Sequence, residues 1–302
     1  MKKMNVGIIG IGRIAGKYIN PVYGNKRYNL FALCDLKESA EQTARKYNAL
    51  FYSNYKEMLL HEEMDLVIIT TPPNTHFEIA KDCLLHKKNV ILEKPAVFNM
   101  DELNVLFELA KKNNVSFDVI FHWMYGNEVL YLKDKIGTFG DIKRIESTVL
   151  DPYTDGNFHI KDEYIGLEGC WFDSGINCLS LLSCFIDIRK LHLVEKQYIY
   201  DDKVHQDIYS KHQYVMGDTD ISITVDWRYR ANHKYTKIYF AKDVLYIDHS
   251  RQIILLNNKL LVDLNDGDRL ENHYKNYFER YRYNLNNTDN ILTIHDILIG
   301  NK

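Results

Sequence analysis

A lysine and an aspartate lie in the surroundings that best suit proton transfer in this chain of 302 residues. Lys94 follows the apolar run 90–92 and Glu93, and it precedes Pro95, which would fix the turn that aims the lysine. Ligands of open α/β sheets bind beyond the carboxyl ends of the strands, so we expect Lys94 to point into such a site. A solvated lysine at a strand end explains the spacing equally well.

The aspartate, Asp173, belongs to an apolar segment that we expect to be helical over residues 174–185. In a helix, Asp173, Asn177 and Ser180 fall at i, i+4 and i+7 and form one polar stripe. A helix that is otherwise apolar nearly all round is buried, and a buried carboxylate without a partner is costly. The stripe should therefore face a substrate, a solvated cleft or a cation such as Lys94. A helix-capping role for Asp173 is the alternative.

Three glycines interrupt the first apolar run, at positions 7, 10 and 12. Glycine weakens a strand and often marks the close approach of another group. Gly10, Gly12 and Ala15 give a GxGxxA pattern between a predicted strand and a predicted helix. In that setting the first glycine makes the turn, the second admits a pyrophosphate at the helix N-terminus, and the third small residue packs helix on strand. We expect a bound dinucleotide; a plain glycine turn is the alternative.

The second predicted strand ends in Asp35, twenty-three residues after Gly12. A carboxylate at this place accepts hydrogen bonds from the adenosine ribose and repels a 2'-phosphate, so it favours NAD over NADP. Lys37 is close enough in sequence to weaken that rejection, which keeps NADP as the alternative cofactor. Asp35 could instead cap the helix that follows it.

The apolar runs divide the chain into an α/β half and a strand-rich half. Up to residue 121 they alternate with amphipathic segments, which indicates a Rossmann-type parallel sheet covered by helices on both faces. After residue 141 strand-like runs follow one another, which indicates an α+β domain with a large, mainly antiparallel open sheet. Residues 268–300 return to a helical pattern. The predicted strands are 5–9, 30–34, 66–70, 90–92 and 116–120, then 144–150, 191–200, 220–229, 235–240, 244–247 and 253–256.

The composition excludes several classes of protein. With 46% hydrophobic and 26% charged residues, the chain has the balance of a soluble globular protein. Its net charge of -3 is spread over both signs, so we expect no nucleic-acid partner, and no apolar run is long enough for a membrane span. Arg13 ends the only run that imitates a secretory signal. Five cysteines without a CxxC pair, and without metal-ligand spacing to histidines, predict a cytoplasmic protein with reduced thiols and no metal.

Four motifs, in order along almost the whole chain, resemble the Gfo/Idh/MocA family of oxidoreductases. They are Gly10-x-Gly12-x-x-Ala15, Thr71-Pro72-Pro73-Asn74-Thr75-His76, Glu93-Lys94-Pro95 and Asp173-x-Gly175-x-Asn177. The resemblance implies a dinucleotide-binding domain over residues 1–121 and a substrate-binding and dimerisation domain over residues 122–287. It also implies that residues 288–302 pack back on the first domain. A small-molecule sugar substrate and a homodimer or dimer of dimers are the expected partners.

The resemblance also implies roles for individual residues. The family usually has a histidine acid/base where Asn177 stands, and an asparagine cannot transfer a proton near neutral pH. We therefore expect Asp173 to be the base, Lys94 to stabilise the developing negative charge, and Asn177 to orient a neighbouring hydroxyl. Contacts to NAD are expected from Gly10, Gly12, Arg13, Ile14, Asp35, Thr71, Pro72, Asn74, His76, Glu93 and Lys94, and contacts to the substrate from His122, Trp171, Asp173 and Asn177.

Within the family, three segments resemble the aldose 1-dehydrogenases that act on galactose or L-arabinose: 172–180, 226–228 and 121–122. That branch implies hydride transfer between the anomeric carbon of an aldose and the nicotinamide. Residues 151–160 depart from the pattern of the branch, so the identity of the sugar is not carried over.

Two other functions stay open. The first is a dehydrogenase or reductase of a sugar nucleotide or a cyclitol in surface-polysaccharide synthesis, for which Arg228 and Arg230 could bind a diphosphate. The second is an NAD-binding sugar sensor without catalysis. A sensor has no need of both Lys94 and Asp173, so their presence together counts against it.

Overall fold

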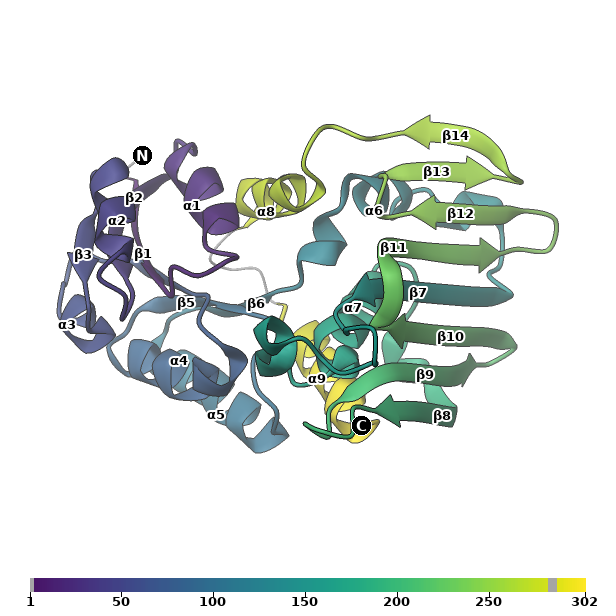
Figure 1. Ribbon diagram of the computed structural model, residues 1–302. Helices are drawn as coiled ribbons and strands as arrows, with labels where there is room; N and C mark the ends of the chain where they lie inside the picture. The colour runs from purple at the N-terminus through teal and green to yellow at the C-terminus, as the bar shows by residue number, and fades with distance from the viewer. Residues whose placement is uncertain (1–2, 282–286) are drawn as a thin grey trace. The chain divides into compact units, whose positions relative to one another are not determined.

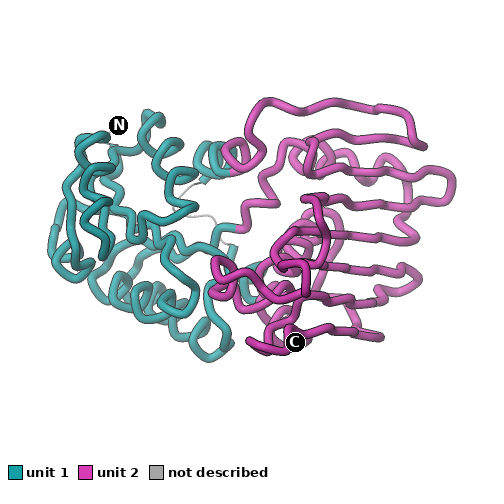
Figure 2. The backbone as a smooth tube through the Cα atoms, viewed as in Figure 1, with its two compact units in different colours: residues 1–120, 274–292 teal, residues 121–273, 293–302 magenta. Residues whose placement is uncertain are grey.

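The computed structural model describes residues 3–281 and 287–302. It divides into two compact units, Met1–Ile120 with Tyr274–Leu292, and Phe121–His273 with Thr293–Lys302 (Figure 2). One boundary follows Ile120, and the other two fall inside α8 (Arg269–Arg280) and α9 (Thr288–Gly300). The division into residues 1–121, 122–287 and 288–302 stays a prediction.

The first unit is built on a six-stranded parallel sheet with the order β3-β2-β1-β4-β5-β6. Helices lie on both sides of this sheet (Figure 1). Every residue of β4 is buried, as expected for a strand of a sheet that is covered on both faces. The strands are β1 (Met4–Ile9), β2 (Tyr28–Cys34), β3 (Leu50–Tyr52), β4 (Leu66–Ile69), β5 (Asn89–Glu93) and β6 (Phe117–Ile120). The helices are α1 (Gly16–Tyr23), α2 (Ala40–Lys46), α3 (Tyr55–Leu59), η1 (Pro73–Thr75), α4 (His76–Leu85) and α5 (Met100–Asn113).

The strand order places a topological switch point between β1 and β4. From β1 the chain continues to β2 and β3 on one side, and it returns to β4 on the other side. Ligands of such sheets bind beyond the carboxyl ends of the strands at this point. The parallel pairing of all six strands confirms the predicted parallel sheet. Among these strands, only β3, which is three residues long, was not predicted.

The second unit is built on an eight-stranded sheet with the order β14-β13-β12-β11-β7-β10-β9-β8. All neighbouring strands are antiparallel except β7 and β10, which are parallel, so the mainly antiparallel sheet is confirmed. The strands are β7 (Arg144–Pro152), β8 (His192–Tyr200), β9 (Asp207–Met216), β10 (Thr219–Asp226), β11 (Arg228–Tyr239), β12 (Val244–Asp248), β13 (Ile253–Leu256) and β14 (Lys259–Asp263). The helices are η2 (His122–Tyr125), α6 (Asn127–Leu132), η3 (Ile136–Phe139), η4 (Asp162–Leu167), η5 (Trp171–Gly175), α7 (Ile176–Leu182) and η6 (Ile188–Lys190).

The strand predictions for this unit are wrong in three places. They omit β9 and β14, and the predicted run 220–229 crosses the end of β10 into the start of β11. In β9 the buried positions include Ser210 and His212, so the alternation of apolar and polar residues that marks a half-buried strand is missing.

Two general predictions concern thiols and membranes. All five cysteines are free thiols, and four of them are buried. Across residues 3–281 and 287–302, no helix has both the length and the apolar character needed to cross a bilayer.

Candidate active site

The glycine turn after β1 has the shape that the sequence predicts. Gly10 adopts φ +94°, and a Cβ there would lie 2.8 Å from the backbone nitrogen of Thr71, so only glycine fits. A Cβ on Gly12 would meet no atom within 4 Å, which leaves the surface of the turn open. Ala15 is buried under the start of α1, whose first N–H groups receive no side-chain cap. The turn and the helix start can therefore take an anionic group.

Asp35 lies beside this turn, at the end of β2. Its Oδ2 accepts a hydrogen bond from the N–H of Ile11 at 2.6 Å, and its Oδ1 accepts one from the N–H of Lys37 at 2.8 Å. The helix that follows begins only at Ala40, so Asp35 does not cap it. The carboxylate is held next to the open turn, where the ribose of a dinucleotide is expected.

Replacing Asp35 with serine tests its role in cofactor choice. The variant loses a charged acceptor for the ribose hydroxyls and the repulsion of a 2'-phosphate, so we expect NAD to bind about tenfold more weakly and NADP to bind more tightly. Dissociation constants of both cofactors for the wild type and D35S measure this. An unchanged ratio of the two constants contradicts the assignment.

The loop after β4 contains the predicted cofactor residues Thr71, Pro72 and Asn74. Asn74 and Pro72 are exposed, while the hydroxyl of Thr75 donates to Oγ1 of Thr71 at 2.8 Å. His76 is fully buried, and its two ring nitrogens each lie 2.9 Å from a carbonyl oxygen, one of Pro95 and one of Thr71. Burial lowers the pKa of His76. The ring ties the loops after β4 and β5 together and is enclosed between them.

Glu93 ends β5 and is buried directly before Lys94. Its Oε1 accepts hydrogen bonds from the hydroxyls of Tyr18 at 2.7 Å and Tyr274 at 2.5 Å, and its Oε2 accepts the N–H of Lys94 at 2.8 Å. Burial raises the pKa of Glu93, while the Lys94 charge and these hydrogen bonds act against the rise. The structure therefore uses this carboxylate to hold the backbone of Lys94, which joins Pro95 by a cis peptide bond.

In the second unit, Asp173 lies in the π-helical turn η5, directly before α7. Such turns are rare and are frequent at functional sites. Asn177 donates from Nδ2 to the carbonyl of Asp173 at 3.1 Å, and its buried Oδ1 has no hydrogen-bond partner among the described residues. Ser180 is buried, and its hydroxyl donates to the backbone carbonyl of Asn177 in the same helix at 2.9 Å. The turn η5 and the helix α7 together form one helical segment, which begins at Trp171, earlier than the predicted residue 174, and ends at Leu182.

Two predicted substrate residues are enclosed in this unit. Trp171 is fully buried; its indole N–H donates to the carbonyl of Leu298 at 2.9 Å, and its ring stacks on His212 at 3.6 Å between centroids. His122 is buried with its Nδ1 3.1 Å from Nδ1 of His273.

A buried charge pair that no sequence motif indicated lies near Asp173. Oδ1 of Asp151 accepts hydrogen bonds from Nζ of Lys234 at 2.5 Å and from Nδ2 of Asn232 at 2.7 Å. Burial raises the pKa of Asp151; the Lys234 ammonium acts against the rise, and the Asp173 carboxylate adds to it. The available signal was a charged residue at an inward position of each strand, since alternate residues of β7 and β11 are buried.

A second cluster of polar residues contains Arg269 and the buried side chains of Glu128 and His249. Nδ1 of His249 donates to Oε1 of Glu128 at 2.8 Å, and its Nε2 lies 3.0 Å from the hydroxyl of Thr236. Burial would raise the pKa of Glu128, but the hydrogen bond and charge of His249 hold it below its usual range. Burial lowers the pKa of Arg269 despite the negative charge of Glu128.

His273 makes stability depend on pH. Burial lowers its pKa to about 3, against about 6.5 for an exposed histidine. Between those pH values the histidine of the unfolded chain binds a proton and that of the folded chain does not. The contribution of His273 to the free energy of unfolding is therefore fully present above pH 6.5 and is lost as the pH falls toward 3. We expect the slope of unfolding free energy in this range to decrease by up to about 1.4 kcal/mol per pH unit in H273F. Denaturant unfolding at several pH values measures it, and equal slopes contradict it.

Arg228, one of the two arginines that could bind a diphosphate, already pairs with a carboxylate, that of Asp226. Its guanidinium forms two hydrogen bonds of 2.9 Å with Asp226 and lies 4.7 Å above the ring of Tyr209. The charge of the guanidinium and its flat face are thus both already in contact with residues of the same unit.

A protein-family model matches most of the first unit. Residues 4–121 match the family model described as the oxidoreductase family GFO_IDH_MocA with an NAD-binding Rossmann fold. By this match, residues 4–121 are similar to the NAD-binding Rossmann domain of the Gfo/Idh/MocA oxidoreductases. The match covers the glycine turn, Asp35 and the Lys94 turn of this Rossmann domain.

Relatives of this Rossmann domain are mostly named as oxidoreductases. The chain spans 31–40% of the length of the first curated relatives that it matches, at 29–32% identity. It is also 23% identical over 304 residues to the myo-inositol 2-dehydrogenase of Thermotoga maritima, covering 92% of this chain and 84% of that one.

Solved structures show that the fold beyond the Rossmann domain is also shared. A levoglucosan dehydrogenase in complex with NADH has a TM-score of 0.83 at 15% identity, covering 98% of this chain and 95% of that chain. A 3-ketoreductase from Actinomadura kijaniata, in complex with NADP and TDP-benzene, has a TM-score of 0.84 at 14% identity, covering 98% and 96%. At these identities the likeness concerns the fold alone.

Proposed function

We propose that the protein is an NAD(P)-dependent oxidoreductase that transfers a hydride between a hydroxyl-bearing sugar carbon and the nicotinamide. The observation that carries this proposal is the carboxyl edge of the parallel sheet, where the glycine turn, Asp35 and Lys94 follow β1, β2 and β5. The open surface at Gly12 and the uncapped start of α1 fit a pyrophosphate, and the Asp35 carboxylate fits a ribose.

The protein's own residues would handle the proton. Bound nicotinamide supplies the hydride acceptor. Oxidation of a hydroxyl also releases a proton, and we assign Asp173 as the base that takes it. Lys94 would donate a hydrogen bond to the reacting oxygen and stabilise its developing negative charge. Asn177, whose Oδ1 has no partner among the described residues, would accept a hydrogen bond from a neighbouring hydroxyl.

The pair of Lys234 and Asp151 supports this assignment of Asp173. Two carboxylates in one low-dielectric region repel each other, and a buried one needs a partner. Lys234 pairs with Asp151 at 2.5 Å, so the second carboxylate adds no uncompensated charge beside the proposed base.

For the substrate, we propose the anomeric carbon of an aldose such as galactose or arabinose. The segments 172–180 and 226–228 support it through their resemblance to the corresponding dehydrogenases. A cyclitol is the second candidate, supported by the myo-inositol 2-dehydrogenase relative that covers most of the chain. The pairing of Arg228 with Asp226 counts against a sugar nucleotide.

A substrate panel tests the proposal. Galactose, arabinose and other free aldoses, myo-inositol and sugar nucleotides are offered with NAD and with NADP, and the absorbance of the reduced nicotinamide is followed. We expect a free aldose to give turnover with NAD. Binding of NAD without turnover on any member of the panel would favour a sensor and contradict the proposal.

We also propose that two copies associate through the second sheet. Residues on one face of β7, β9 and β10 are buried, and the alternating residues on the other face are only partly covered within one chain. The family resemblance supports this face as the place of association. Light scattering should give twice the chain mass of 35.6 kDa, or four times if dimers pair.

A further inference from the structure

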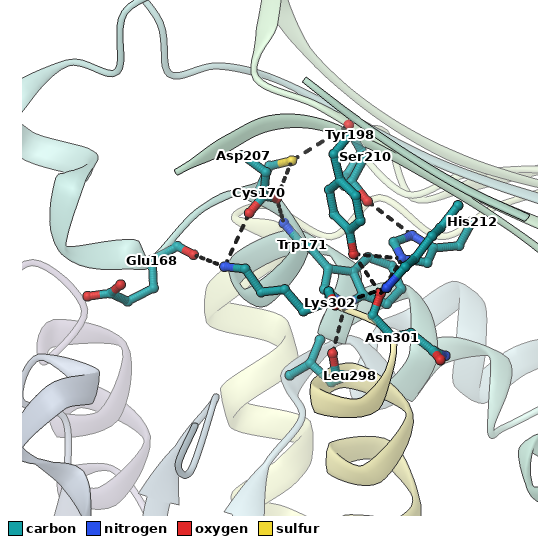
Figure 3. Close-up of polar contacts among 12 residues, drawn as sticks. Glu168, Cys170, Trp171, Tyr198, Asp207, Ser210, His212, Leu298, Asn301 and Lys302 are labelled. Carbon is teal, nitrogen blue, oxygen red and sulfur yellow. Dashed lines mark hydrogen bonds and ion pairs between the residues drawn. The ribbon is translucent and has the colours of Figure 1, made fainter. Parts of the chain in front are cut away.

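Asp207, at the start of β9, is fully buried against the segment that carries Asp173 (Figure 3). Its Oδ2 accepts the backbone N–H of Trp171 at 2.7 Å and the thiol of Cys170 at 3.1 Å. Trp171 begins the η5 turn, and Asp173 is two residues further on. One carboxylate oxygen therefore holds the start of the turn on which the proposed base lies.

The backbone is shaped to admit this carboxylate. Gly169 adopts φ +95°, and a Cβ there would lie 2.2 Å from Oδ1 of Asp207. A side chain at this position would therefore collide with the carboxylate. The N–H of Asp173 bonds to the carbonyl of the same Gly169 at 3.1 Å, which links the proposed base to the contact point.

Lys302 supplies the positive charge. Its Nζ lies 3.3 Å from Oδ1 of Asp207 and donates to the carbonyl of Glu168 at 3.1 Å (Figure 3). It also lies 4.4 Å from the centre of the Phe172 ring. Among the ion pairs of residues 3–281 and 287–302, Asp207 has no other cation. The ammonium therefore contacts Phe172 in the η5 turn as well as Glu168, the residue before Gly169.

The end of α9 is held independently of this ammonium. The carbonyl of Asn301 accepts the hydroxyl of Tyr198 at 2.7 Å and lies 3.2 Å from Nε2 of His212. Burial lowers the pKa of His212 to about 4, so the ring is neutral at pH 7. Nζ of Lys196 donates to the carbonyl of Lys302 at 2.9 Å. These contacts fix the backbone from which the Lys302 side chain reaches Asp207.

We propose that Lys302 is a positioning residue that, by neutralising buried Asp207, fixes the η5 turn and the carboxylate of Asp173. The inference rests on the proposed function, because it gives Asp173 the role of base. A buried carboxylate whose cation is removed is strongly unfavourable, and it relaxes by taking a proton or by moving toward water. Either change loosens the start of η5. A displacement of about 1 Å in a reacting group lowers turnover by about a hundredfold.

The test compares K302M with K302R and with the matched control K196M. Lys196 also contacts this end of the chain, through the carbonyls of Asn301 and Lys302, but Tyr198 and His212 still hold Asn301 without it. Among the described residues, no hydrogen bond or ion pair joins Lys196 to Asp207 or η5. We expect K302M to lower kcat by about ten- to a hundredfold with the KM for NAD nearly unchanged. K302R should restore most of kcat, and K196M should keep it within about twofold of the wild type.

A second substitution separates charge from packing. Asparagine at position 207 can still accept the Trp171 N–H through its carbonyl oxygen, but it carries no charge. We therefore expect D207N to restore part of the kcat lost in K302M. A purely structural role for Lys302 would lower the melting temperature in both Lys302 variants and leave kcat of the folded enzyme unchanged.

Three results would overturn the proposal: a kcat of K302M within twofold of the wild type, an equal loss in K196M, or a loss that neither K302R nor D207N relieves. Asp173→Asn, measured alongside, distinguishes this failure from failure of the proposed function. If D173N loses turnover while K302M does not, only the positioning role is wrong. If D173N keeps turnover, the role of Asp173 as base is wrong.

Discussion

Replacing Lys94 with alanine will lower the turnover number by about a thousandfold while NAD binding is retained. Loss of one preorganised donor to a developing oxyanion costs about a hundred- to a thousandfold in kcat, and loss of its positive charge adds to this. The backbone should survive the change, because Glu93 holds Lys94 through its N–H and the neighbouring Pro95 carbonyl lies 2.9 Å from the His76 ring.

The measurement combines steady-state kinetics with a titration of NAD. Lys111→Ala is the matched control, since Lys111 is an exposed lysine near the end of α5 in the same unit. K111A should have wild-type kcat. K94A with a kcat near that of the wild type would remove Lys94 from the mechanism, whereas loss of NAD binding in K94A would make it a cofactor residue instead.

Replacing Asp173 with asparagine will have an effect of similar size on kcat. Removal of a general base typically costs about a hundred- to ten-thousandfold, and asparagine has the same shape but cannot take the proton. The Ser174 hydroxyl, which donates to Oδ2 of Asp173 at 3.2 Å, can still donate to the amide oxygen. Asp218→Asn, in the exposed turn between β9 and β10, is the control and should leave kcat unchanged.

The double variant K94A/D173N shows whether the two residues serve one step. Residues that act as a unit have strongly non-additive effects, so the double variant should be about as slow as the slower single variant. Effects that multiply fully would assign Lys94 and Asp173 to independent steps and contradict their pairing in proton transfer.

The sequence predicted the parts of the fold that depend on local patterns. The buried strands of the first sheet are continuous apolar runs, and the Gly10 turn needs a residue that tolerates φ +94°, so both leave a clear mark in the sequence. Strand β9 left no such mark, because its inward positions include Ser210 and His212, which hydrogen bond to each other at 3.0 Å.

The polar contacts within each unit were predicted less completely, because they join residues far apart in the chain. Lys234 and Asp151 are 83 positions apart and meet only because β7 and β11 are neighbours in the sheet. Glu93 was predicted to contact the cofactor, and the structure gives its carboxylate to two tyrosine hydroxyls and the Lys94 N–H. Motif spacing indicates which residues gather near a strand end, but it does not show which of them bond to one another.

Transfer of deuterium from substrate to cofactor tests the central claim most directly. An aldose deuterated at its anomeric carbon is incubated with NAD and the protein, and the reduced cofactor is analysed by mass spectrometry. Direct hydride transfer predicts reduced nicotinamide that is heavier by one deuterium with the wild-type protein, and almost none with K94A or D173N. Reduced cofactor without the label would contradict transfer from the anomeric carbon, and NAD that binds yet is never reduced by any sugar or cyclitol would contradict the account as a whole.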